Sequence, residues 1–168
     1  MILHPKLYLK NVKEIDLEML KKHNIQGLIL DVDNTLIDVD RKLLEGAEEW
    51  CKGLKAEGIK VCLVSNTNKI DKVVAVATVL DVPYITFAKK PSTKGLHRGR
   101  GKLGLEPEAV AVVGDQISTD VWGGNRAGMF TILVKPLDKR DVLITKVKRP
   151  VDNWLVRRYL KKRDKGVI

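Results

Sequence analysis

Short apolar runs alternate with amphipathic stretches along the chain from residue 25 onward. Each apolar run has the length of a buried strand and is followed by polar residues. The runs that we predict to be strands are Ile25–Val32, Ile59–Val64, Tyr84–Phe87, Ala109–Val113 and Phe130–Val134.

The stretches between these runs have helical periodicity. Leu43–Glu57 places apolar side chains at i, i+4, i+7, i+8 and i+11, and Gly58 ends the pattern. Ile70–Leu80 and Thr119–Ala127 are also predicted to be helices. Strands that alternate with helices imply parallel strands joined by right-handed crossovers. The predicted fold class is therefore α/β, a three-layer, Rossmann-like open parallel sheet.

The length and composition fit one globular domain. A chain of 168 residues, 44% hydrophobic and 31% charged, can bury a core of its own. We predict a single domain over residues 1–168 with its core at about residues 25–137. The first 24 residues and the basic segment 138–168 are interpreted as appendages to this core.

The sequence also indicates the compartment. No apolar run approaches the roughly 18 residues of a membrane span, and residues 1–6 lack the layout of a signal peptide. Cys51 and Cys62 lie within apolar periodic segments, which predicts reduced core thiols rather than a disulfide or a zinc site. We therefore expect a cytoplasmic protein.

Charge is distributed unevenly along the chain. The net charge is +10, and residues 138–168 hold eleven Lys and Arg against four Asp and Glu. A basic tail is typical of proteins that bind phosphate groups, acidic lipid headgroups or RNA. The alternative is a charged helix whose side chains are simply solvated.

Polar residues stand at the ends of three predicted strands. Asp31 and Asp33 end the first run, Ser65 follows the second, and Asp115 follows Ala109–Val113. Parallel strands bring their carboxyl ends to one edge of the sheet, where ligands bind near the topological switch point. Carboxylates crowded there would repel one another unless a cation bound them, and Mg²⁺ suits an all-oxygen site that also takes a phosphate oxygen.

The spacing of Asp31 and Asp33 points to a reaction. Two residues apart in an extended segment, both side chains face the same way. A metal-neutralised carboxylate can attack phosphorus, while a second carboxylic acid protonates the departing alkoxide and then deprotonates water. The Ser65 hydroxyl, a lysine and backbone N–H groups would hold the other phosphoryl oxygens.

Four segments resemble, in order, the motifs of the haloacid dehalogenase (HAD) phosphatase superfamily. They are DVDNTL at residues 31–36, SN at 65–66, KP at 90–91 and GDQISTD at 114–120. The residues of the first and last motifs, together with AKKP at residues 88–91, resemble those of subclass IIIA, the YqeG-type group. That group is similar to organellar phosphatases that act on phosphatidylglycerophosphate.

The resemblance implies roles for the acidic residues. Asp31 would be the nucleophile that forms an aspartyl-phosphate, and Asp33 the general acid and base. The Mg²⁺ ligands would be Asp31, Asp33 through its backbone carbonyl, and Asp115. Asp120 would support the metal site and orient the lysine, and Thr35 of the first motif would support phosphate binding.

The resemblance also implies which residues bind the phosphoryl group. Ser65 would bind it, with Asn66 beside it. Lys90 matches the lysine of the third motif because a proline follows it, although Lys89 and Lys94 are close enough to be alternatives.

The motif spacing leaves no room for a cap domain. Only 33 residues separate Asp31 from Ser65, and 24 separate Ser65 from Lys90. We therefore predict a capless enzyme with an open site, which suits a phosphate presented on something large. The leading substrate is phosphatidylglycerophosphate. The alternatives are a soluble sugar phosphate, nucleotide or phosphoprotein, or a non-catalytic RNA- or ribosome-binding module.

The basic tail contains a second amphipathic pattern. Val151, Trp154, Leu155 and Tyr159 fall at i, i+3, i+4 and i+8, among several Lys and Arg. This helix would either dock its apolar stripe on the core, which is the commoner use, or rest on an anionic membrane at the inner face of the cell.

A glycine-rich segment before the fourth strand is interpreted separately. Gly99, Gly101 and Gly104 match G-x-G-x-x-G, but no apolar strand precedes them, which argues against nucleotide binding. Glycines cost helix stability, so we expect this segment to be irregular.

Overall fold

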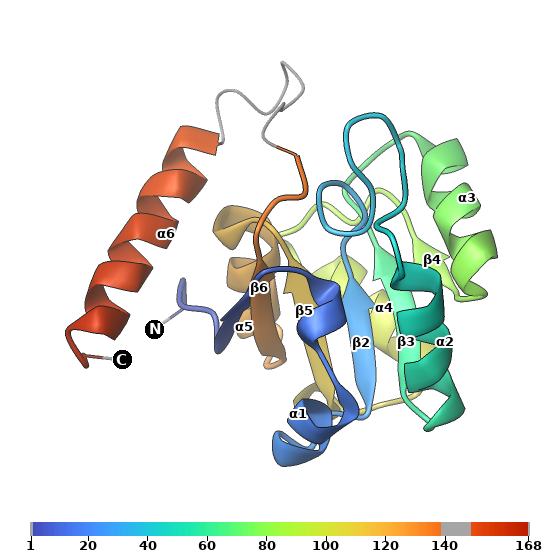
Figure 1. The fold of residues 1–168 in the computed structure, drawn as a ribbon, viewed down its shortest axis with the longest axis horizontal. Coiled ribbons are helices and arrows are strands. Elements are labelled where there is room, and N and C mark those ends of the chain that lie inside the picture. Colours follow the sequence, from blue (N-terminus) through green and yellow to red (C-terminus); the bar gives the residue numbers. More distant parts are fainter. Residues whose placement is uncertain (1, 139–148, 168) are drawn as a thin grey trace.

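The computed structural model describes residues 2–138 and 149–167. Within them, six strands form one parallel sheet with helices on both sides (Figure 1). The strands are β1 (Leu7–Leu9), β2 (Gly27–Leu30), β3 (Lys60–Val64), β4 (Tyr84–Ile85), β5 (Val110–Gly114) and β6 (Phe130–Val134). Their order across the sheet is β1-β6-β5-β2-β3-β4, and the sheet does not close. The five predicted strands are confirmed, each within two residues of its predicted ends.

The helices cover the sheet in two layers. They are α1 (Leu17–Lys22), α2 (Ala47–Ala56), α3 (Ile70–Leu80), α4 (Thr93–Leu103), α5 (Trp122–Arg126) and α6 (Arg149–Asp164), with short turns η1 (Val12–Glu14), η2 (Pro107–Ala109) and η3 (Ile117–Val121). Side chains alternate along a strand. Leu28 and Leu30 of β2 therefore pack with α2 and α3, whereas Ile29 packs with α4. The predicted three-layer fold is confirmed.

The chain reverses its direction across the sheet at β2. From β2 it passes outward to β3 and β4, and α4 then returns it to β5 on the other side of β2. The carboxyl ends of β2 and β5 are therefore neighbours, with Leu30 paired to Val113. Such a switch point is the usual ligand site of an open α/β sheet. The prediction of a capless chain agrees with the structure, since residues 31–90 hold only α2, α3, their strands and loops.

The interpretation of the first 24 residues as an appendage is wrong. Leu7–Leu9 is an edge strand that pairs with β6 in parallel. Val12, Ile15 and Leu20 behind it are buried in the same apolar cluster as β2. A strand of three residues is too short to show a periodic pattern, so the sequence carried little sign of it.

Two predicted helices differ in the structure from their sequence patterns. The helix predicted from Leu43 begins at Ala47, because Gly46 has φ of +80° and Leu43 forms a bridge to Ile37. The helix predicted from Thr119 is divided into a π-helical turn and α5.

The expectation of an irregular glycine-rich segment is also wrong, because α4 runs unbroken through it. Gly95 and Gly99 are buried, and both mark a close approach. A Cβ on Gly95 would lie 2.6 Å from the Cβ of Ala88, and one on Gly99 would lie 2.6 Å from Val64. Glycine on this face therefore lets the helix pack directly on the strand and loop beneath it, which offsets its poor helix propensity.

The C-terminal helix α6 lies beside the N-terminal segment (Figure 1). Its Tyr159 is buried and meets the rings of His4 and Tyr8 edge-on, with centroids 5.8 and 6.5 Å apart. Docking is thus found for part of the predicted stripe, but Val151 and Trp154 are 53% and 55% exposed. Residues 139–148 of the predicted basic appendage lie outside the described residues. Among the described helices, none has the length and apolar character needed to cross a bilayer.

Candidate active site

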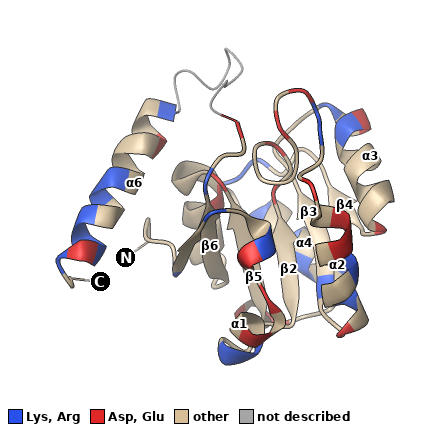
Figure 2. Ribbon diagram, in the orientation of Figure 1, with Lys and Arg blue, Asp and Glu red and all other residues tan. Residues whose placement is uncertain are grey.

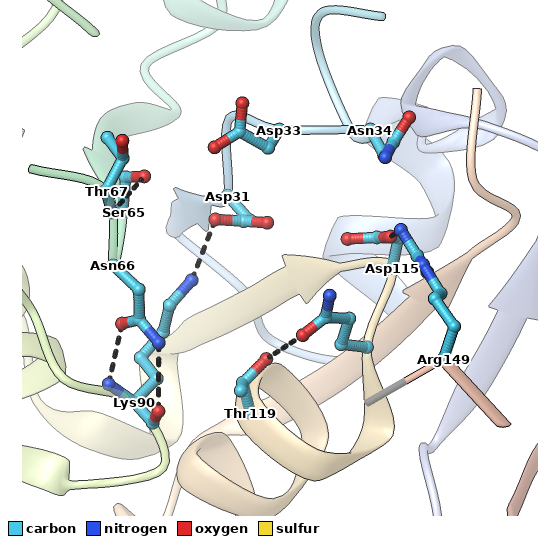
Figure 3. Close-up of a pocket in the computed structure, with 11 residues that line it drawn as sticks. Asp31, Asp33, Asn34, Ser65, Asn66, Thr67, Lys90, Asp115, Thr119 and Arg149 are labelled. Atoms are coloured by element: carbon cyan, nitrogen blue, oxygen red, sulfur yellow. Dashed lines mark hydrogen bonds and ion pairs between the residues drawn. The ribbon is translucent and has the colours of Figure 1, made fainter. Parts of the chain in front are cut away.

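A cavity of about 260 Å³ opens at the carboxyl ends of β2, β3 and β5 (Figure 3). Asp31 follows β2 directly, and its backbone N–H donates to the carbonyl of Val113 at 2.9 Å, which continues the ladder between the strands. Ser65 follows β3 and Asp115 follows β5. The cavity is lined by Asp31, Asp33, Asn34, Ser65, Asn66, Thr67, Lys90, Asp115, Gln116, Thr119 and Arg149. Residues far apart in the sequence therefore meet at the predicted edge of the sheet.

Lys90 occupies the centre of the charge network. Its Nζ lies 2.9 Å from Asp31 Oδ1 and 2.6 Å from Asp120 Oδ1, and it donates to the carbonyl of Val64 at 2.8 Å. Burial alone would lower the pKa of this ammonium group, but the Asp120 and Asp31 carboxylates outweigh it and hold the pKa above its usual range. Lys90 is therefore a buried cation with three acceptors for its three donors.

The backbone of Lys90 is held by one side chain. The Asn66 amide accepts from the Lys90 N–H at 2.7 Å and donates to the Lys90 carbonyl at 2.9 Å (Figure 3). The other two candidate lysines, Lys89 and Lys94, are exposed. Of these three lysines, only Lys90 lies at the acidic cluster. The Asn66–Lys90 hydrogen bonds connect the loop after β3 with the segment before α4.

Three carboxylates form a cluster that fits a divalent cation. Oxygen atoms of Asp31, Asp115 and Asp120 all lie within 4.8 Å of one another. Burial raises the pKa of Asp31 to about 7, although Lys90 opposes the change. Burial and the Asp31 carboxylate also raise the pKa of Asp115 well above its usual range. An all-oxygen donor set of crowded, buried carboxylates is what Mg²⁺ prefers.

The side chain of Asp33 lies apart from this cluster. Its Oδ1 forms an ion pair with Nζ of Lys72, on α3, at 2.6 Å, and the carboxyl is 47% exposed. Asp31 and Asp33 both line the cavity, as their spacing predicts. Asp33 therefore borders the open part of the cavity, whereas Asp31 lies at its base.

Two of the predicted supporting residues lie beneath the cavity. Asp120 is buried and accepts from the Gln116 N–H at 3.2 Å besides binding Lys90. A Cβ on Gly114 would collide with the Asp120 side chain, so glycine is required there. Thr35 is fully buried and is not among the residues that line the cavity.

Sequence reasoning missed several residues at or beside the cavity, among them Thr67, Lys72 and Arg149. Thr67 donates its backbone N–H to the Ser65 hydroxyl at 3.2 Å. Lys72 lies one helical turn into α3, seven residues after Ser65, and its position after a strand was the one available signal. Arg149 comes from α6, and its Nη2 lies 2.6 Å from Oδ2 of Asp115. Its distance from the motifs left no sequence signal.

Comparisons with known proteins agree with this arrangement. A family model described as haloacid dehalogenase-like hydrolase matches residues 39–128, more than half of the chain. The probable phosphatase YqeG of Bacillus subtilis (strain 168) is 40% identical over 153 residues, which are 90% of this chain and 88% of that protein. The chloroplastic phosphatidylglycerophosphate phosphatase 1 of Chlamydomonas reinhardtii is 30% identical over 145 residues. That match takes in 79% of this chain and 53% of the algal protein, so the chain spans about half of that relative.

A solved structure shares the fold. The cobalt-bound deoxy-D-mannose-octulosonate 8-phosphate phosphatase (YrbI) of Haemophilus influenzae superposes with a TM-score of 0.55 at 19% identity. The match covers 67% of this chain and 69% of that chain.

The fold, the acidic cluster at the switch point and these similarities define the class: the chain belongs to the haloacid dehalogenase-like hydrolases. Within that family it is a phosphatase, and the resemblance to the YqeG-type group is confirmed.

Proposed function

We propose that the chain is a Mg²⁺-dependent phosphomonoesterase that uses Asp31 as its nucleophile, and that its substrate is phosphatidylglycerophosphate. The observation that carries the chemistry is the cluster of Asp31, Asp115 and Asp120 at the ends of β2 and β5, in which Lys90 pairs with Asp31 and Asp120. Bound Mg²⁺ would be held by Asp31, Asp115 and the backbone carbonyl of Asp33. It would neutralise the carboxylates and the charge of the phosphoryl group.

The chain's own residues then divide the reaction into two steps. In the first, a carboxylate oxygen of Asp31 bonds to phosphorus as the bond to the alcohol oxygen breaks, and Asp33 gives that oxygen its proton. In the second, Asp33 takes a proton from the water that attacks phosphorus, which releases inorganic phosphate and restores Asp31. Ser65 and the loop N–H groups hold phosphoryl oxygens. Lys90, engaged by Asp31 and Asp120, positions the nucleophile.

The charge of a groove beside the cavity is evidence that the leaving group of the substrate is anionic. Its volume is about 590 Å³, and it shares Asp33, the proposed proton donor to the leaving group, with the catalytic cavity. Phe87 in this groove is 50% exposed. The basic residues along it are Arg41, Lys69, Lys72 and Lys89. An alcohol that carries its own phosphodiester, as phosphatidylglycerol does, matches this charge.

The exposed part of α6 supports a membrane surface as the place of reaction. Val151 and Trp154 are exposed beside Arg157, Arg158 and Lys161, and Figure 2 shows basic residues recurring along the helix. Tryptophan with nearby cations is typical of segments that lie on anionic bilayers. Nucleic acid as a partner rests only on the charge of the tail, and no contact among the described residues favours it.

A panel of phosphate esters tests the chemistry and the substrate together. Released phosphate is measured with phosphatidylglycerophosphate in mixed micelles, glycerol 3-phosphate, a sugar phosphate, a nucleotide and a phosphopeptide, each with Mg²⁺ or EDTA. We expect Mg²⁺-dependent turnover of the lipid, and we expect Asp31→Asn to lower it at least about a thousandfold. Asp81→Asn, whose side chain is fully exposed on the rim of the fold, is the control. Turnover of a soluble ester without turnover of the lipid would refute the substrate while leaving the chemistry.

Vesicle co-sedimentation tests the membrane surface separately. Binding is expected to rise with acidic lipid content and to weaken in Trp154→Ser. The matched control is Val79→Ser, which removes a 47% exposed side chain from α3. Equal binding of both variants and the wild type would exclude this face of α6.

A further inference from the structure

Arg149 reaches the catalytic cavity from the C-terminal helix. Its Nη2 lies 2.6 Å from Asp115 Oδ2, and its side chain is only 9% exposed (Figure 3). It lines the same cavity as Asp31 and Ser65. The cavity therefore contains a buried guanidinium group that comes from outside the four motifs.

A second contact fixes this helix against the site. The Asp152 carboxylate accepts from both the backbone N–H and the hydroxyl of Ser118, at 2.8 and 2.9 Å. Ser118 belongs to η3, the turn that begins two residues after Asp115. Arg149 and Asp152 are three residues apart on one helix face, and Leu155 and Tyr159 continue that face onto the core. The contacts that hold α6 on the core therefore also hold the Arg149 guanidinium group in the cavity.

The other cations of the site already have partners. Lys90 has three donors, and these meet Asp31, Asp120 and the carbonyl of Val64. Lys72 is paired with Asp33. Lys90 therefore has no donor left for a substrate phosphoryl group without leaving one of these acceptors, and Lys72 lines the neighbouring groove rather than this cavity.

A guanidinium group is suited to this task. It presents five N–H donors in a planar fork that matches two oxygens of a phosphate group. If a divalent cation took up the charge of Asp115, that carboxylate would hold the guanidinium group less strongly, and phosphoryl oxygens in the same cavity would be within its reach. We propose that Arg149 binds the phosphoryl group of the substrate and that α6 exists in this enzyme partly to deliver it. The inference rests on the proposed function.

Inorganic phosphate is a direct probe of this role. Its affinity for the full-length protein is measured by calorimetry in saturating Mg²⁺, for the wild type, Arg149→Gln and Arg149→Lys. Arg163→Gln, an exposed position near the end of the same helix, is the matched control. We expect a loss of about tenfold to a hundredfold in Arg149→Gln, as for a lost charge-assisted hydrogen bond. A smaller loss is expected in Arg149→Lys, and none in Arg163→Gln.

Metal affinity, measured by Mn²⁺ titration without phosphate, separates this role from an effect on the metal. We expect Arg149→Gln to bind Mn²⁺ as tightly as the wild type or more tightly, because a cation beside Asp115 has been removed. Weaker Mn²⁺ binding would overturn the proposal, since the phosphate loss would then pass through the metal. Wild-type phosphate affinity in both variants would overturn it as well. Should Arg149→Gln fail to fold, unchanged affinity in Arg149→Lys alone would do so.

The same titration separates this proposal from the proposed function. If the wild type itself binds no phosphate with Mg²⁺ and hydrolyses no ester, the phosphatase mechanism fails and Arg149 loses its role with it. If the wild type binds phosphate and hydrolyses esters while the variants match it, only the role of Arg149 fails.

Discussion

Replacing Lys90 by methionine removes the cation that holds the acidic cluster together. The two side chains have similar length and volume, so the substitution creates little cavity. It leaves Asp31 and Asp120 facing each other, with exposed fractions of 13% and 2%, without their shared ammonium group. The experiment thus isolates the electrostatic contribution of one buried charge.

The expected cost is large because both ion pairs are buried. Breaking a buried pair by removing one partner costs about 3–5 kcal/mol, since the remaining charge stays desolvated. With a urea m-value of about 2 kcal/mol per M, the midpoint of unfolding should fall by roughly 2 M. Hydrolysis should fall with it, because Asp31 loses the contact that positions it.

The pH range of the effect follows from the two pKa shifts. The raised pKa of Lys90 means that its contribution to stability is fully present below the unfolded value of roughly 10.4. The Asp31 carboxyl, with its pKa raised to about 7, is mainly ionised above pH 8. Lys90 lowers the pKa of Asp31, so in Lys90→Met this carboxyl stays protonated to higher pH, and the cost of the substitution should increase as the pH rises from about 7 toward 9.5.

Urea unfolding with EDTA, followed by circular dichroism, measures this difference. Lys94→Met, an exposed position four residues away, is the control and should stay within about 0.5 kcal/mol of wild type. Mg²⁺ should stabilise Lys90→Met more than wild type, because the variant cluster is more negative and ligand binding adds to stability. A Lys90→Met protein that unfolds within about 0.5 kcal/mol of wild type in EDTA would refute the reasoning.

Three further predictions follow from packing and burial. Gly95→Ala should lower the free energy of unfolding by about 1–3 kcal/mol, because its Cβ would clash with Ala88 in the segment before α4. Gly101→Ala, which has open space around its Cβ, should raise the free energy of unfolding by about 0.5–1 kcal/mol. Urea unfolding measures both changes. Because burial raises the pKa of Cys62 to about 12, the native protein at pH 8 should not react there with Ellman's reagent, and reaction should appear on denaturation; rapid native labelling would contradict this. Asp152→Ala should cost about 1–3 kcal/mol in urea unfolding by leaving the Ser118 N–H without its partner, and an unchanged midpoint would show that this contact does not anchor α6.

The strands and the acidic residues were predictable because each rests on a local pattern. The apolar run before Asp31 has the length of a buried strand and is followed directly by a polar residue. Parallel pairing then brings the ends of such strands to one edge of the sheet. The edge strand Leu7–Leu9 has too few residues for a pattern, and its position depends on pairing with β6. The same limit applies to Arg149, whose role depends on how α6 docks on η3.

The glycine-rich helix shows a different limit. Helix propensity counts only the cost of Gly95 and Gly99, and it therefore predicts an irregular segment. The compensating gain is the close approach of α4 to Ala88 and Val64, which is a property of the packed sheet and not of the helix alone. Propensity and packing have opposite signs here, and packing prevails.

The two hydrogen bonds between Asn66 and Lys90 join the loop after β3 to the segment before α4, so that the two move together. One amide side chain grips both the N–H and the carbonyl of the same residue, so a shift of the β3 loop carries the ammonium group with it. An aspartate there could still accept from the N–H but would repel the carbonyl oxygen, and a threonine is too short to reach both. The counter-ion of Asp31, the proposed nucleophile, is thereby tied to the loop that holds Ser65, and a distortion that displaces one should also displace the other.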